Sequence, residues 1–118
     1  MEENVNYYEK LKYKMDDYAH GVYENTRNFP KEEMYGITSQ LRRSSLSVIL
    51  NYIEGYARRK KENCKVYKNF LEISYGSLKE SKYLLHFSLI EGYLKKENYK
   101  KLITIADEIG SMLYKIIN

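Results

Sequence analysis

Apolar residues recur every three or four positions along four stretches of the chain, a period typical of amphipathic α-helices. These stretches cover about residues 5–28, 38–60, 64–90 and 96–117. The last stretch is the most regular, with apolar positions at Tyr99, Leu102, Ala106, Ile109, Leu113 and Ile116. Short connections make consecutive helices antiparallel. The pattern therefore predicts an all-α protein, an antiparallel up-down-up-down four-helix bundle that forms one domain of residues 1–118.

Turn-forming residues set the predicted helix ends. Pro30 disfavours a helical conformation at Phe29, so the first helix should end near residue 28. Thr38 or Ser39 can cap the exposed amides of the second helix with its hydroxyl group. Gly92 suits the left-handed conformation that closes the third helix.

The second predicted helix has two apolar faces. One stripe contains Leu41, Ser44, Val48, Asn51 or Tyr52, and Gly55, and the other contains Leu46, Leu50, Ile53 and Ala57. At about 100° per residue the two stripes lie on roughly opposite sides of the helix. A helix with two apolar faces needs partners on both sides, so the pattern predicts a bundle that also self-assembles.

The third predicted helix is rich in small residues along its main stripe, including Ser74, Ser77 and Ser81. Small side chains let neighbouring backbones approach closely. We therefore predict close helix packing at Gly76 and Ser77.

Composition places the chain among globular, helix-rich proteins. Its 118 residues include six glycines and one proline, and no stretch approaches the roughly 18 apolar residues of a membrane span. The first residues are acidic and polar, unlike a secretory signal. A single cysteine, Cys64, fits a reducing compartment. We therefore expect a cytoplasmic protein that does not enter a membrane.

Positive charge is concentrated in one part of the chain. Residues 38–68 contain eight basic and two acidic side chains, although the whole chain carries a net charge of only +4. Such a local excess suits a polyanion or an acidic protein partner. It equally suits a solvated face that keeps an assembly soluble.

Candidate chemistry of other kinds is weak. Helical bundles hold metal ions through paired Glu-x-x-His motifs, whereas this chain offers a single Asp17-x-x-His20 pair. Cys64 lies among lysines that can lower a thiol pKa, but the sequence places no base beside it. Phosphate-binding loops and nucleophile elbows are absent from the sequence. We therefore expect neither an enzyme nor a cofactor or metal.

Asn51, Glu54 and Gly55 form the main polar group of the second predicted helix. Asn51 falls on the core stripe, where an amide can fix helix register. Glu54 precedes Arg58 by four residues, the favourable order for a helical ion pair. Gly55 costs about 1 kcal/mol relative to alanine, so close backbone approach should compensate. We interpret all three as determinants of packing.

Residues 29–55 carry a pattern that resembles a known family signature, approximately F-P-x-x-E-x-Y-G-L-T-x-Q-L-R-R-A-x-x-S-I-P-x-N-I-A-E-G. The matching residues are Phe29, Pro30, Glu33, Tyr35, Gly36, Thr38, Gln40, Leu41, Arg42, Arg43, Ser47, Asn51, Glu54 and Gly55. A second segment resembles F-L-x-x-A-x-G-S-L-x-E-x-x-x-x-L through Phe70, Leu71, Gly76, Ser77, Leu78 and Glu80. The chain departs from the pattern at Ile49, where proline is usual, and at Ile53, where alanine is usual.

The signature is similar to that of the bacterial four-helix bundle proteins associated with 23S rRNA intervening sequences. This resemblance implies an antiparallel bundle that assembles into a ring-like homopentamer. The family is related to the accessory variability determinants of diversity-generating retroelements, basic pentamers that bind a reverse transcriptase and nucleic acid. The resemblance thus implies a homo-oligomer, with RNA, DNA or a reverse transcriptase as candidate partners.

We therefore predict a non-enzymatic, basic scaffold or accessory factor that binds RNA or DNA. The residues predicted to contact nucleic acid are Arg42, Arg43, Arg58, Arg59, Lys60, Lys61 and Lys65. Arginine and lysine contact phosphates, and tyrosines interleaved with them can stack on unpaired bases. The alternative is a protein-interaction module that docks an acidic partner without nucleic acid.

Overall fold

The computed structural model describes residues 6–59 and 64–118, and this part of the chain forms four long α-helices and no β-strand. The helices are α1 (Tyr7–Thr26), α2 (Ser39–Arg58), α3 (Lys65–Ile90) and α4 (Lys96–Ile117). A 3₁₀ turn, η2 (Lys31–Glu33), and a π-helical turn, η3 (Met34–Thr38), connect α1 to α2. The all-α class and the positions of all four helices are therefore as predicted, to within two residues at each end where the ends are described.

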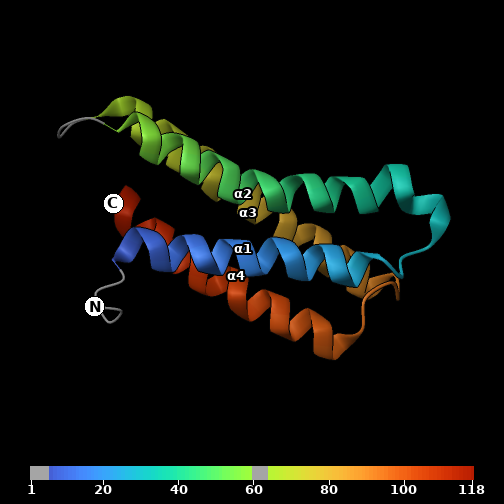
Figure 1. Cartoon of the computed structure of the whole chain (residues 1–118). Helices are drawn as coiled ribbons and strands as arrows, with labels where there is room; N and C mark the ends of the chain where they lie inside the picture. Colours follow the sequence, from blue (N-terminus) through green and yellow to red (C-terminus); the bar gives the residue numbers. More distant parts are fainter. Residues whose placement is uncertain (1–5, 60–63) are drawn as a thin grey trace.

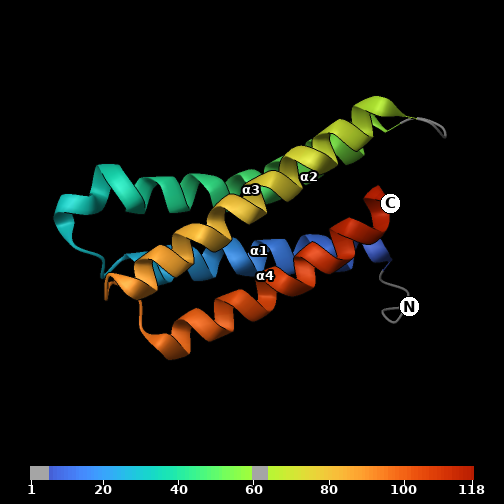
Figure 2. The same ribbon diagram turned by 180° about the vertical axis from the view of Figure 1, so that it is seen from behind.

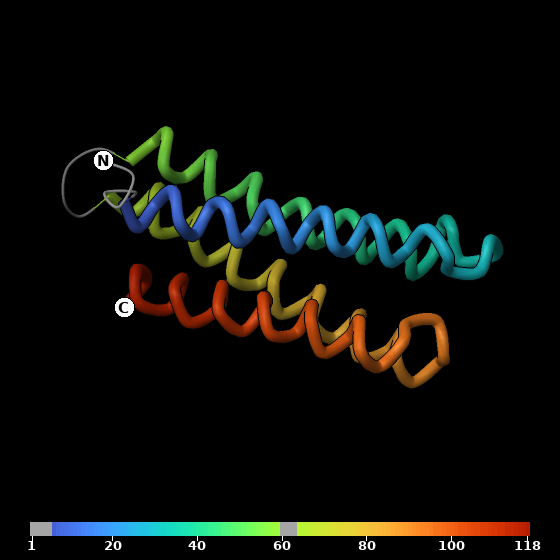
Figure 3. The backbone as a smooth tube through the Cα atoms, turned by 60° about the horizontal axis from the view of Figure 1, so that its bottom comes forward, coloured from blue at the N-terminus to red at the C-terminus, as the bar shows by residue number. Residues whose placement is uncertain are grey.

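Each helix packs against its neighbour in sequence, and α1 also packs against α4 (Figures 1 and 2). The contact between α2 and α3 is the most extensive. The Tyr7 hydroxyl, near the start of α1, donates a hydrogen bond to the Met112 carbonyl, near the end of α4. Lys14, two turns further along α1, forms an ion pair with Glu108, one turn before Met112 in α4. The first turn of α1 and the last turn of α4 consequently lie at the same end of the molecule (Figure 3).

The start of α2 differs from the prediction. Neither Thr38 nor Ser39 caps the helix, because Thr38 is already helical and makes no capping bond. The π-helical turn η3 runs directly into α2, and the Glu33 carboxylate accepts a hydrogen bond from the Ile37 amide at 3.4 Å. The predicted cap at Thr38 or Ser39 is wrong because a longer glutamate side chain performs this role one turn earlier.

The other helix ends follow local chemistry. Asn6 caps α1 by accepting a hydrogen bond from the Glu9 amide at 2.9 Å. The Cys64 sulfur accepts a hydrogen bond from the Tyr67 amide at the start of α3. After α3, Gly92 has a φ of 82°, the left-handed conformation predicted for it.

The core lies along the apolar stripes that periodicity identified. Its largest fully buried side chains are Tyr18, Tyr52, Leu11, Met15, Leu41, Leu71, Leu78, Leu85, Ile109, Leu113, Val22 and Val48. Buried serines are accommodated through hydrogen bonds: Ser74 donates to the Val48 carbonyl at 2.6 Å, and Tyr18 and Ser81 share a bond of 2.7 Å. These bonds offset the cost of placing hydroxyl groups in an apolar interior.

The second apolar stripe of α2 lies on the outside of this chain. Leu50 is 59% exposed and Ile53 39% exposed, whereas Leu46 is half-buried. On α3, the exposed apolar side chains are Val66, Ile73, Tyr83, Phe87 and Ile90. The two-faced character of α2 is thus present in the folded chain.

Candidate nucleic-acid interface

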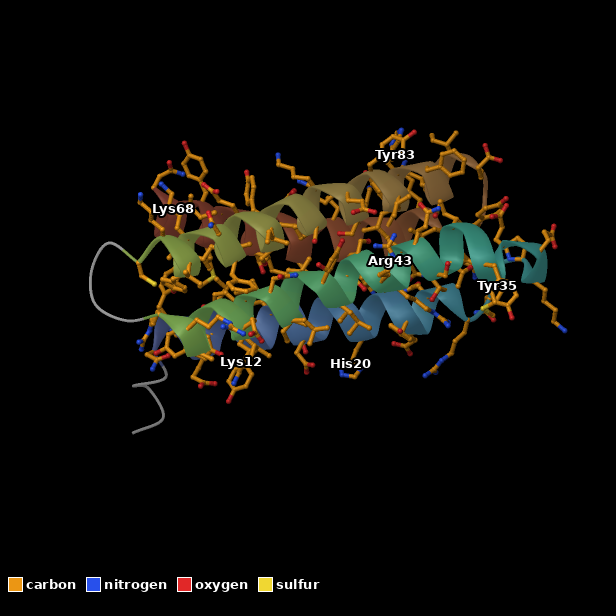
Figure 4. All side chains as sticks on the ribbon, turned by 90° about the horizontal axis from the view of Figure 1, so that it is seen from above. Lys12, His20, Tyr35, Arg43, Lys68 and Tyr83 are labelled. Carbon is orange, nitrogen blue, oxygen red and sulfur yellow. The ribbon has the colours of Figure 1, made fainter. Side chains whose placement is uncertain are left out.

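The predicted basic residues fall into two groups at different places along the bundle. Arg42 and Arg43 lie in the first turn of α2, whereas Arg58 and Arg59 lie at its end. Sixteen residues of helix separate them by about 24 Å at 1.5 Å per residue. In Figure 4, Lys68 lies near one end of the molecule and Arg43 lies nearer the end that carries Tyr35. Lys60 and Lys61 lie outside the described residues.

Arg42 is held by contacts within the chain. Its Nε donates a hydrogen bond of 2.8 Å to the Thr26 hydroxyl, and its guanidinium lies 4.6 Å from the centre of the Tyr23 ring. These contacts join α2 to the end of α1. Arg43 is exposed beside them and lines a shallow cavity with Met34 and Leu46. Of these two neighbours, Arg43 is the better placed to meet a ligand.

Arg58 and Arg59 are exposed but supported by neighbouring side chains. Arg58 forms an ion pair with Glu54 at 2.6 Å, as the four-residue spacing predicted. Arg59 donates a hydrogen bond of 2.6 Å to the Tyr56 hydroxyl, and its guanidinium lies 3.8 Å from the centre of that ring. The ion pair partly neutralises Arg58, whereas Arg59 keeps its charge and is oriented by an aromatic ring.

Four tyrosines form a cluster beneath Arg59, which we call the tyrosine cluster: Tyr8, Tyr52, Tyr56 and Tyr67. Tyr8 stacks on Tyr56 with ring centres 3.6 Å apart and on Tyr52 at 5.0 Å. The Tyr52 hydroxyl donates a hydrogen bond to the Tyr8 carbonyl at 3.2 Å, and burial raises its pKa above the ordinary value of 10.0. The tyrosine cluster thus joins α1, α2 and α3 and supports the basic side chains above it.

Lys65 and Lys68 line a surface cavity of about 730 Å³ at the same end of the molecule. Its other walls come from Tyr67 and Leu71 of α3 and from Ile116 and Ile117 of α4. Among the described residues, no carboxylate lies within ion-pair distance of either lysine. The cavity therefore combines an apolar floor with two lysines that pair with no carboxylate of the described residues.

The signature residues of α2 and α3 meet at the seam between these helices. The Asn51 amide donates hydrogen bonds of 2.9 Å to the carbonyl and to the hydroxyl of Ser47. The Ser47 hydroxyl is bonded in turn to that of Ser77 at 2.7 Å. Asn51 is half-buried. It therefore takes part in a polar network at the edge of the core.

The two signature glycines have different surroundings. A Cβ added at Gly55 would lie 2.7 Å from the Cβ of Phe70, so this position requires glycine for close approach of α2 to α3. A Cβ added at Gly76 would meet no atom within 4 Å. Within this chain, close packing at Gly76 is wrong because Gly76 faces outward from α3, whereas Ser77 contacts α2 through its hydrogen bond with Ser47.

His20, the weak candidate for metal binding, has a different carboxylate partner from the Asp17 that the sequence predicted. His20 lies 3.4 Å from the Asp16 carboxylate, one helical turn away, and both side chains are well exposed. The described residues contain no group of three or more His, Cys, Asp or Glu side chains placed to hold a metal ion.

Sequence reasoning missed a further set of basic and aromatic residues between α3 and α4. A cavity of about 330 Å³ is lined there by Tyr75, Lys79 and Lys82 of α3 and by Tyr114 and Lys115 of α4. On α3, residues 68, 75, 79 and 82 are spaced by seven, four and three, so they lie on one face of the helix. Grouping lysines and tyrosines by helix face would therefore have found them. Charge counted along the chain does not reveal Lys79 and Lys82, because Glu72 and Glu80 offset them, nor Lys115, because it comes from a different helix.

Together these features define a class of protein with four α-helices and cationic side chains gathered at one end. The chain belongs to the 23S rRNA-intervening sequence protein family, whose family model matches residues 10–115. This match confirms the resemblance carried by the signature residues.

The fold is similar to a solved crystal structure. That structure is described as a protein with unknown function from the S23 ribosomal protein family from Bacteroides thetaiotaomicron VPI-5482. The two chains are 22% identical, the match covers 92% of this chain and 98% of that chain, and the TM-score is 0.79. At this identity the likeness shows the fold alone. No curated protein sequence matches the chain significantly.

None of the helices in residues 6–59 and 64–118 combines the length and the apolar content that crossing a bilayer requires.

Proposed function

We propose that this protein is a non-enzymatic scaffold or accessory factor that binds RNA or DNA through the end of the bundle where α2 finishes and α3 begins. The observation that carries the proposal is the gathering there of four basic residues: Arg58, Arg59, Lys65 and Lys68. Among the described residues, their one ion-pair partner is Glu54, which pairs with Arg58. Phosphate groups are the natural counter-charge for such a cluster. Lys60 and Lys61 belong to the same proposal by their position in the sequence.

The tyrosine cluster supports this proposal by holding the cations in place. A guanidinium stacked on an aromatic ring loses less side-chain freedom when it binds a phosphate. Arg59, which lies over Tyr56, is in this position. Arg43 offers a further exposed cation at the other end of α2, whereas Arg42 is engaged with Thr26 and contributes chiefly to helix packing.

We further propose that the four helices form the antiparallel bundle expected from the sequence and that copies assemble, with five as the expected number. The contacts of Tyr7 with Met112 and of Lys14 with Glu108 support opposed directions for α1 and α4. The exposed Leu50 of α2 supports assembly because water-exposed apolar side chains gain by burial against another copy. Multi-angle light scattering that reports a monomer at micromolar concentration would contradict the assembly proposal.

Salt dependence and substitution test nucleic-acid binding. The test variant is Arg58→Gln, Arg59→Gln, Lys65→Gln, and the control changes Lys95, Lys96 and Lys100, exposed lysines at the far end, to glutamine. Each phosphate contact to a single strand contributes about 0.7 to the slope of log affinity against log salt. We expect the test variant to lower that slope by about 2 and to weaken RNA binding, while the control retains both.

The outcome also decides between this function and its rival. An unchanged RNA affinity in the test variant would show that these side chains do not contact phosphate. Binding of an acidic protein or of a reverse transcriptase, with no affinity for RNA or DNA, would favour the protein-interaction module. Capture of the labelled nucleic acid at low salt and its release at moderate salt supports the proposal.

A further inference from the structure

The groove between α3 and α4 extends the basic end of the molecule toward its middle. The cavity at Lys65 and Lys68 ends at Leu71 and Ile116, and the cavity of about 330 Å³ begins one turn further along α3, at Tyr75. Ile116 and Lys115 are adjacent in α4; Ile116 lines the first of these cavities and Lys115 lines the second. The two cavities are therefore consecutive parts of one groove, which we call the α3–α4 groove.

Lysines run along the whole α3–α4 groove: Lys65, Lys68, Lys79, Lys82 and Lys115. Asp107 pairs with Lys82 at 2.6 Å, and in the described part of the chain no carboxylate lies within ion-pair distance of the other four. A line of uncompensated lysines matches a flexible polyanion better than a single anionic group.

Two tyrosines stand at the inner part of the α3–α4 groove. Tyr114 is 57% exposed, so much of its side chain is accessible to a ligand. Tyr75 is half-buried, and the Lys79 ammonium lies 5.3 Å from the centre of its ring. Small residues, Gly110 and Ser111, line the groove beside them. This arrangement leaves room for a flat aromatic group next to a cation.

We propose that the α3–α4 groove binds a single-stranded nucleic acid, with phosphates on the lysines and unpaired bases stacked on Tyr114 and Tyr75. Stacking requires exposed base faces, which a duplex conceals. Seventeen residues separate Lys65 from Lys82, or about 26 Å of helix, which is long enough to contact several consecutive phosphates of one strand. This inference rests on the proposed function and adds the strandedness of the ligand and its path.

Fluorescence anisotropy with a labelled single-stranded RNA of about 12 nucleotides, and with the same sequence as a duplex, tests the inference. The charge variant is Lys79→Gln, Lys115→Gln, and the stacking variant is Tyr114→Leu. The matched control is Lys95→Gln, Lys96→Gln, which removes the same charge from exposed positions at the start of α4.

The two variants have different expected signatures. The charge variant should lower the salt slope by about 1.4, because two contacts to a single strand are lost at about 0.7 each. The stacking variant should weaken single-strand binding by about fivefold or more and leave the salt slope unchanged. The unmodified protein should bind the single strand more tightly than the duplex, and the control should match it.

Other outcomes overturn the inference in distinguishable ways. If Arg58→Gln, Arg59→Gln weakens RNA binding and neither groove variant does, the proposal for the α3–α4 groove is wrong, whereas the proposed function of the basic end is retained. If none of the variants changes RNA binding, the proposed function fails as well. Equal affinity for single strand and duplex refutes the stacking step. If the charge variant loses binding to poly-glutamate but keeps RNA binding, the groove docks an acidic protein instead.

Discussion

Replacing Gly55 by alanine tests the close contact between α2 and α3 at this residue. Alanine is favoured over glycine inside a helix by about 1 kcal/mol, so propensity alone predicts stabilisation. The new methyl group would lie 2.7 Å from the Cβ of Phe70 and 3.4 Å from both a ring carbon and the carbonyl oxygen of Tyr67. Because a Cβ is fixed to the backbone, relief requires α3 itself to move away.

The expected result is the difference between these two effects. Overpacking of this kind costs typically about 1–3 kcal/mol, and the 2.7 Å contact with the Phe70 Cβ, which is itself fixed to the backbone, places Gly55→Ala in the upper half of that range. We therefore expect a net loss of about 1–2 kcal/mol, which corresponds to a fall in Tm of about 4–8 °C for a chain of this length. Circular dichroism during thermal and urea denaturation measures both quantities.

Gly76→Ala is the matched control, since it makes the same chemical change inside α3 where an added Cβ meets no atom within 4 Å. It should stabilise the protein by about 0.5–1 kcal/mol. All measurements must be made at equal protein concentration, because assembly couples stability to concentration. If Gly55→Ala stabilises the protein as much as Gly76→Ala does, the close approach of α2 to α3 at Gly55 does not exist.

Two further predictions concern titration and charge. Burial raises the pKa values of Tyr18 and Tyr52 above 10.0, so the unfolded chain loses these protons at a lower pH than the folded chain does. The stability that is present below pH 10 should therefore fall as the pH rises further. Alkaline unfolding followed by tyrosinate absorbance checks this, and Tyr18→Phe should reduce the loss of stability. A double-mutant cycle on Glu54 and Arg58 should give a coupling of about 0.3–0.5 kcal/mol that shrinks with salt, and a coupling that is independent of salt would contradict an exposed ion pair.

The helices were predictable because their signal is local. The alternating spacing from Tyr99 to Ile116 needs one buried face and nothing else, and α4 was predicted with the bounds that the structure has. Gly92 was predictable for a similar reason, since a helix end followed by a tight connection favours a residue that tolerates positive φ.

The start of α2 was not predictable in the same way. Two hydroxyl residues, Thr38 and Ser39, satisfied the usual capping rule, yet the π-helical turn before them depends on the unusual backbone of Gly36, with φ −114° and ψ −111°. Glu33 replaces the expected cap because its longer side chain spans that turn. A rule based on residue type and spacing does not contain this geometry.

The candidate site was predictable by charge but not by position. Counting charge along the chain found Arg58, Arg59 and Lys65, which lie at one end, and joined to them Arg42 and Arg43, about 24 Å away. It missed Lys115, because this residue belongs to α4 and lines the same cavity as Lys79 of α3 only in the folded chain. Proximity between helices depends on their rotation and register, which a single sequence does not state.

The Glu33 carboxylate joins two connections that are far apart in the sequence. One oxygen accepts the Ile37 amide in η3, and the other accepts a hydrogen bond from the Tyr93 hydroxyl at 3.1 Å, sixty positions further along the chain. The chain between these residues includes α2 and α3, so the bond ties the connection from α1 to α2 to the connection from α3 to α4, at the end of the molecule opposite Arg58 and Arg59. A single carboxylate thus crosslinks two connections that the local sequence does not place side by side.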